Sequence, residues 1–110
     1  MTGTGQELPM ARAGCGLDDR SLTVQLDRYQ RLGTRAASIA QCGLVLEVCF
    51  DADVDVDLLQ ETIAIERQCC SFFTIGYDTL DRRLSISVDG SDRLDALLAL
   101  RSALRGPATP

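Results

Sequence analysis

Cysteine is the residue type with the most reactive chemistry in this sequence. The 110 residues contain five cysteines and no histidine. The lack of histidine excludes Ser-His-Asp and Cys-His catalytic systems and every metal site that needs an imidazole ligand. An odd number of cysteines, in a chain whose first residues lack a secretory signal pattern, is not typical of a disulfide framework. We therefore expect free thiols and a cytoplasmic location.

Two of the cysteines, Cys69 and Cys70, are adjacent and close a helical pattern. Their Cα atoms lie about 3.8 Å apart across a trans peptide, which is shorter than the roughly 4.4–6.8 Å of a relaxed disulfide. Where a helix ends, the backbone changes direction and both sulfurs can point at one soft ion, such as Hg(II), As(III) or Zn(II). The pair is therefore predicted to be a metal or metalloid site. The other interpretation is that these side chains fill the core as small hydrophobic groups.

A third ligand would complete a trigonal sulfur site. Cys15, just before the first predicted helix, is the preferred third ligand, and Cys49 is the second choice because the alternation of its strand turns it from the apolar face. Cys42 is interpreted as incidental. Glu66 lies one turn before the pair. Three interpretations of it are open: a hydrogen-bond acceptor that supports the ligands, an oxygen ligand of the ion, or a solvated side chain on the helix surface.

The elements that position these cysteines follow from the spacing of apolar side chains. The pattern predicts a helix from Ser21 to about Ala40, a strand over 44–50, a helix from Val56 to the cysteine pair, strands over 73–77 and 84–88, and a last helix over 94–104. Aspartates between the first strand and the second helix are interpreted as helix-start residues rather than a calcium loop.

This order predicts one α+β domain over residues 15–105, a two-layer sandwich with a three-stranded sheet and three helices in the order α-β-α-β-β-α. The strand–helix–strand unit should form a right-handed crossover and the last two strands a hairpin. Helices on one side would leave the outer sheet face open to a second copy of the chain. Residues 1–14 and 106–110 have loop composition and are expected to be disordered.

Charge and hydropathy exclude two classes of partner. The chain has 11 basic and 16 acidic residues, a formal net charge of −5, which disfavours a phosphate backbone as partner. No apolar run approaches the roughly 18 residues of a membrane span. A small ion is therefore a better expected ligand than nucleic acid or a membrane.

The string Glu66-Arg67-Gln68-Cys69-Cys70-Ser71-Phe72-Phe73 resembles the Glu-x-x-Cys-Cys-Pro-Phe signature of small bacterial proteins and regulator-appended modules associated with heavy-metal resistance. Cys15-Gly16-Leu17 is similar to the early Cys-x-Leu of that group. The resemblance implies thiol-based sensing or sequestration, with Cys15 beside the pair. Ser71 stands where the signature has Pro.

Two other function classes stay open at this point. An enzyme of thiol redox chemistry or metalloid reduction would use Cys69 or Cys70 as its nucleophile. A dimeric interaction domain would keep the cysteines for packing only.

Overall fold

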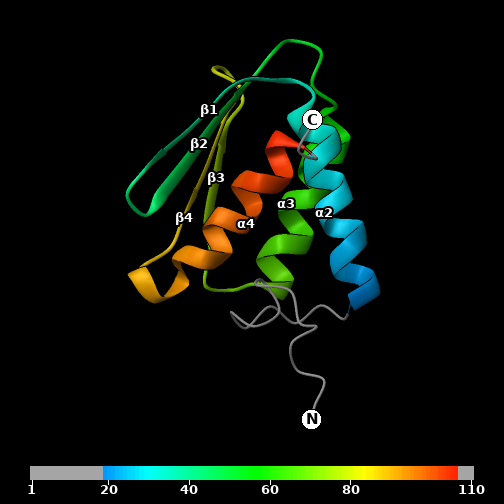
Figure 1. The fold of residues 1–110 in the computed structure, drawn as a ribbon. Coiled ribbons are helices and arrows are strands. Elements are labelled where there is room, and N and C mark those ends of the chain that lie inside the picture. Colours follow the sequence, from blue (N-terminus) through cyan, green and yellow to red (C-terminus); the bar gives the residue numbers. More distant parts are fainter. Residues whose placement is uncertain (1–18, 107–110) are drawn as a thin grey trace, which may run out of the picture.

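The computed structural model describes residues 19–106 (Figure 1). In chain order the elements are α2 (Asp19–Gly33), β1 (Ala36–Cys42), β2 (Val45–Phe50), α3 (Val56–Cys69), β3 (Thr74–Asp78), β4 (Arg83–Ser87), the 3-10 turn η2 (Ser91–Arg93) and α4 (Leu94–Arg105). The predicted α+β class with three α-helices is confirmed. Within residues 19–106, every helix falls short of the length and apolar character needed to cross a membrane.

The prediction of one helix from Ser21 to Ala40 is wrong beyond Gly33, where α2 ends. Residues 34 and 35 make a turn, with their N–H groups donating to the carbonyls of Arg31 and Leu32. The chain then returns as strand β1, which pairs antiparallel with β2. Gly43, in the two-residue connection between these strands, has a φ of +60°, a conformation that glycine adopts without strain. Hairpin pairing therefore overrides the weak helical spacing of this segment.

The sheet has four strands rather than the predicted three, in the spatial order β1-β2-β4-β3. Each neighbouring pair is antiparallel, and the predicted hairpin of the last two strands is confirmed. Because β4 lies between β2 and β3, the strand–helix–strand unit is split and its two strands do not pair. The order of elements is accordingly α-β-β-α-β-β-α, with the extra strand supplied by residues 36–42.

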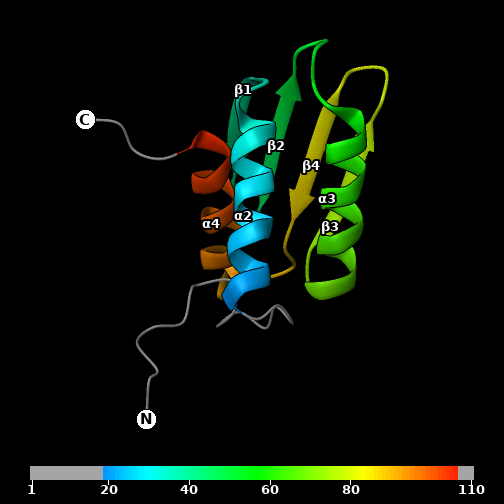
Figure 2. The same ribbon diagram turned by 90° about the vertical axis from the view of Figure 1, so that its right-hand side faces the viewer.

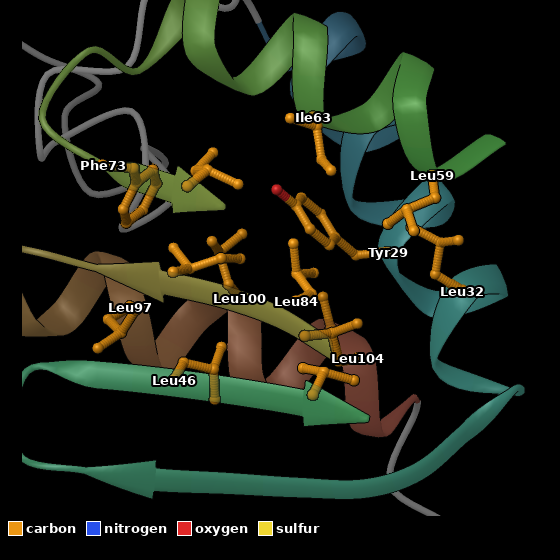
Figure 3. Close-up of a cluster of buried hydrophobic side chains, with 14 of the residues drawn as sticks. Tyr29, Leu32, Leu46, Leu59, Ile63, Phe73, Leu84, Leu97, Leu100 and Leu104 are labelled. Carbon is orange, nitrogen blue, oxygen red and sulfur yellow. The ribbon is translucent and has the colours of Figure 1, made fainter. Parts of the chain in front are cut away.

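The three helices cover one face of the sheet, as predicted, and no described element covers the other (Figures 1 and 2). The core lies between these two layers (Figure 3). Large side chains from both the helices and the sheet are fully buried there, including Leu22, Tyr29, Leu32, Leu46, Leu59, Leu84, Ile86, Leu97, Leu100 and Leu104. Alternation along β2 determines which of its side chains join the core, because Leu46, Val48 and Phe50 are buried while the residues between them are not.

Two local features fix the helices beside the sheet. Asp55 caps the start of α3, where its carboxylate accepts a hydrogen bond of 3.0 Å from the N–H of Leu58. This confirms the helix-start interpretation for one of the aspartates. Gly33 ends α2 where it meets α4, and a Cβ at this position would overlap the backbone carbonyl of Leu104. The glycine that weakens the helical pattern is therefore needed for close helix packing.

The predicted domain boundaries fall largely outside the described residues. Regular structure runs from Asp19 to Arg105. The predicted tail begins at Gly106, which is described and donates its N–H to the carbonyl of Ala103 at 3.0 Å. Residues 1–18 and 107–110, which include Cys15, lie outside the described part of the chain.

Candidate thiol site at the end of α3

The cysteine pair lies at the point where α3 gives way to β3. Cys69 is the last helical residue, and Cys70 is the C-cap, with φ −129° and ψ 77°. The N–H of Cys70 still donates to the carbonyl of Glu66 at 2.8 Å, and its own carbonyl accepts from the N–H of Phe73 at 3.2 Å. The backbone therefore turns sharply after the pair, as predicted. It does so with Ser71 in place of the proline of the signature.

Aromatic packing supports this turn. The rings of Phe72 and Phe73 lie with their centroids 4.6 Å apart. The guanidinium carbon of Arg93 lies 4.6 Å from the centroid of the Phe72 ring, at cation–π distance. Arg93 comes from η2, just before α4, so the turn is tied to the last helix as well as to the sheet.

The two adjacent cysteines are in different chemical states. Cys69 is half-buried and has a free thiol. Cys70 is completely buried and is disulfide-bonded. The cysteines therefore do not bond to each other, which agrees with the short Cα separation expected across their peptide bond. The expectation that every thiol of the chain is reduced is wrong for Cys70. The number of cysteines in a sequence does not show which sulfur atoms the fold places together.

The other predicted ligands are placed as follows. Cys15 lies outside the described residues. Cys49 is half-buried on the outer face of the sheet, between its register partners Ser38 and Arg83. The sheet separates it from the helices, so Cys49 does not join the pair. Cys42 is a free, exposed thiol at the end of β1.

Glu66 is the unexpected member of this region, because its side chain is fully buried. Its Oε1 accepts hydrogen bonds from the hydroxyl of Tyr29 at 2.9 Å and from Nε2 of Gln25 at 3.1 Å. Its Oε2 has no hydrogen-bond partner among residues 19–106. The interpretation of Glu66 as a solvated side chain is therefore wrong. These contacts are compatible with Glu66 as an oxygen ligand of an ion and with Glu66 as a hydrogen-bond acceptor that supports the ligands.

The electrostatics of the pair Glu66 and Tyr29 follow from this burial. Desolvation raises the pKa of the Glu66 carboxyl, and the hydrogen bonds from Gln25 and Tyr29 offset part of the rise. The pKa of Tyr29 is raised well above its usual range, first by burial and then by the neighbouring carboxylate. Figure 3 shows Tyr29 inside the buried cluster, with its hydroxyl oxygen at the tip. Burial therefore disfavours the charged form of each group.

Gln25 belongs to the buried hydrogen-bond network around Glu66 and is not among the residues predicted from the sequence. It is fully buried, and its Nε2 also donates to the carbonyl of Thr62 at 3.0 Å. Its Oε1 accepts from Arg28 at 2.9 Å. A signal was present, because Gln25 follows Leu22 by three positions and precedes Tyr29 by four, on the buried stripe of the helix. A glutamine at such a position needs buried hydrogen-bond partners.

The start of α2 lies beside the end of α3. The helices are antiparallel, because Gln25 contacts Glu66 while the later residue Arg28 lies 3.8 Å from the earlier residue Glu61. Figures 1 and 2 show both helix ends at the same end of the molecule. The chain therefore enters α2, at Asp19, close to the cysteine pair.

In residues 19–106, no group of three or more Cys, Asp or Glu side chains has the arrangement of a metal site. A complete sulfur site at the end of α3 would thus need a ligand from outside that range. Comparison of the chain with models of known protein families, with curated proteins and with solved structures finds no match.

Proposed function

We propose that this domain is a thiol-based binding module for a soft metal or metalloid ion, and that Cys69, Cys70 and Cys15 are its ligands. The observation that carries the proposal is that Cys70 is bonded to another sulfur while the adjacent Cys69 is a free thiol. A sulfur bonded to Cys70 lies in direct contact with the pair. This supports a cluster of three sulfurs at one helix end, the ligand set that Hg(II) and As(III) favour and that Zn(II) accepts.

Cys15 is the best choice for the third sulfur. The sequence has five cysteines, and Cys42, Cys49 and Cys69 are free. Cys15 precedes Asp19 by four residues, a length of chain that reaches at most about 14 Å. Since α2 begins beside the end of α3, that reach is sufficient to bring Cys15 to the pair. Cys49, the second choice, lies on the opposite side of the sheet from the helices, which favours Cys15 as the third ligand.

The chemistry of the region favours binding over catalysis. Ion binding needs deprotonated thiols but no separate base, and the chain has no histidine to serve as one. We infer a role in sensing or sequestration in the cytoplasm, a reducing compartment in which the disulfide of Cys70 would open and free its thiol for an ion. The disulfide beside a free thiol favours one alternative, a thiol redox enzyme. Its nucleophile would be the half-buried Cys69, because Cys70 is fully buried and a nucleophilic cysteine must be reached by its substrate.

The third alternative, a dimeric interaction domain, would use the outer face of the sheet. Neighbouring positions on that face carry Glu47, Arg83 and Ser85 beside Val45 and Cys49, so the face is of mixed polarity rather than an apolar patch for a second copy. We therefore rank it below ion binding.

Native mass spectrometry of the reduced protein with Hg(II), As(III) or Zn(II) tests the proposal. We expect one ion per chain, and a loss of affinity of about 100-fold or more in Cys69→Ser and in Cys70→Ser, because each variant breaks the chelate. Cys42→Ser, at an exposed position, is the matched control and should bind like the parent chain. Unchanged affinity in the double variant Cys69→Ser, Cys70→Ser would show that the pair is not the site.

A further inference from the structure

We propose that the free edge of the sheet at β1 pairs with the same edge of a second copy of this chain, so that two sheets become one continuous sheet. Strands β1 and β3 are the edges of the four-stranded sheet, and within residues 19–106 no further strand pairs with either. An unpaired edge presents backbone N–H and C=O groups that a second strand can bind. This interface is the edge of the sheet rather than its outer face, and it goes beyond the proposed function.

The hydrogen bonds of β2 show which backbone groups of β1 point outward. The N–H of Phe50 donates to the carbonyl of Arg82 at 2.9 Å, on the side of β4. In an antiparallel ladder every second residue bonds to the same side, so the even-numbered residues of β2 bond to β4 and not to β1. Ile39 and Gln41 lie opposite two of these even-numbered residues. Their N–H and C=O groups therefore face the free edge.

The two edges of the sheet differ in how open they are to pairing. At the β3 edge, the guanidinium of Arg67 donates a hydrogen bond of 2.6 Å to the carbonyl of Ile75, and Asp78 is exposed at the end of the strand. The seven residues of β1 contain no charged residue and no proline, the features that commonly protect an edge. Because only the β1 edge is open in this way, pairing closes at a dimer and does not continue into a fibre.

Pairing about a two-fold axis at Ala40 uses all of the outward groups of Ile39 and Gln41. In this register Ile39 lies opposite Gln41 of the partner subunit, and the two residues exchange both of their N–H···O=C bonds. The same exchange occurs on the other side of the axis. The side chains that meet on the outer face are small and exposed, namely those of Ser38, Ala40 and Cys42. Small side chains permit the close approach of two strands.

Helix α4 supplies the charge complementarity that favours a second copy over an unrelated peptide. It lies at the β1 edge of the helix layer (Figure 2), where Arg101 donates to Oε1 of Gln41 at 3.2 Å. A two-fold axis at β1 sets the two α4 helices antiparallel. Asp95 lies in the first turn of α4 and Arg105 in the last, so each acidic helix end faces a basic one. Leu98, between these turns, is half-buried and would gain apolar contact.

Analytical ultracentrifugation of the full chain over a series of concentrations tests the dimer. We expect the parent chain to dimerise. Ala40→Lys sets two ammonium groups opposite each other at the axis and should raise the dissociation constant by about 100-fold or more. Within one chain the added ammonium lies beside Glu47, the register partner of Ala40, so the fold should be kept, which circular dichroism verifies. Thr74→Lys, at an exposed position of the β3 edge, is the matched control and should dimerise like the parent.

Crosslinking tests the register. Facing residues at the axis have Cα atoms about 4.5 Å apart, within the range of roughly 4.4–6.8 Å for a disulfide. Ala40→Cys in a Cys42→Ser background should therefore give a covalent dimer on mild oxidation, joined at position 40 by peptide mapping. Thr74→Cys in the same background should not. A parent chain that stays monomeric, a folded Ala40→Lys chain that dimerises like the parent, or equal crosslinking of the two cysteine variants overturns the inference. None of these results bears on ion uptake, so the proposed function stands or falls separately.

Discussion

The hydroxyl of Tyr29 donates a hydrogen bond of 2.9 Å to Oε1 of Glu66, and both side chains are buried. This bond joins the middle of α2 to the last turn of α3, the turn that leads into Cys69 and Cys70. In the described part of the chain, the other carboxylate oxygen of Glu66 has no hydrogen-bond partner. An acidic group is thus held inside the core directly before the thiol site, and its hydrogen bonds fix the helix end that carries the cysteines.

Removing the hydroxyl of Tyr29 should destabilise the fold. In Tyr29→Phe the buried carboxyl of Glu66 loses one of its two hydrogen bonds, which we expect to cost about 1–3 kcal/mol of unfolding free energy. Urea unfolding followed by circular dichroism measures this difference. Tyr77→Phe is the matched control, since that tyrosine is only partly buried, and should change stability by less than about 0.5 kcal/mol. Equal losses in the two variants would contradict the role given to the Tyr29 hydroxyl.

Glu66 should make stability depend on pH. Its pKa in the folded protein is raised above the ordinary value of 4.5. The stability associated with its neutral form is therefore fully present below pH 4.5 and is lost as pH rises through the folded pKa. In Glu66→Gln this loss should be absent, so the unfolding free energy of the parent chain should fall relative to the variant from pH 4.5 upward. Glu61→Gln, at an exposed position on the same helix, is the control. Parallel pH profiles for the parent chain and Glu66→Gln would contradict the raised pKa.

Gly33 should tolerate no side chain. In Gly33→Ala the added Cβ meets the backbone carbonyl of Leu104, which cannot move without shifting α4. We expect a loss of about 1–3 kcal/mol or more, as for other overpacked positions. Thermal unfolding checks this. Gly76→Ala is the matched control, because nothing lies within 4 Å of a Cβ at that position of β3. A Gly33→Ala chain as stable as Gly76→Ala would show that α2 and α4 pack less closely than described.

Much of the fold follows from the periodicity of apolar residues. The one large error of the prediction, a helix where β1 forms, has a clear origin. Residues 36–42 are mostly small, and Ala36 and Ile39 happen to continue the spacing of α2. Only pairing with β2 makes this segment a strand, and such pairing is not visible in a local window. The strong alternation of 44–50 and 84–88, by contrast, predicts both strands with small errors at their ends.

The candidate site was only partly predictable for a similar reason. The sequence places Cys69 and Cys70 at a helix end, because the helical spacing stops there. It does not show that Cys70 is buried or that its sulfur is bonded, because both depend on which segments the fold brings to that end. The burial of Glu66 also depends on a partner far away in sequence, Gln25, which lies 41 residues earlier.

Counting the ligands of the bound ion tests most directly whether three sulfurs bind one soft ion at the end of α3, as we propose. X-ray absorption spectroscopy of the reduced chain loaded with one equivalent of As(III) reports the neighbours of the bound arsenic. We predict three sulfur neighbours in the parent chain and in Cys42→Ser, and fewer in Cys15→Ser and Cys69→Ser. Arsenic surrounded by oxygen alone, or three sulfur neighbours retained in Cys69→Ser, would contradict it.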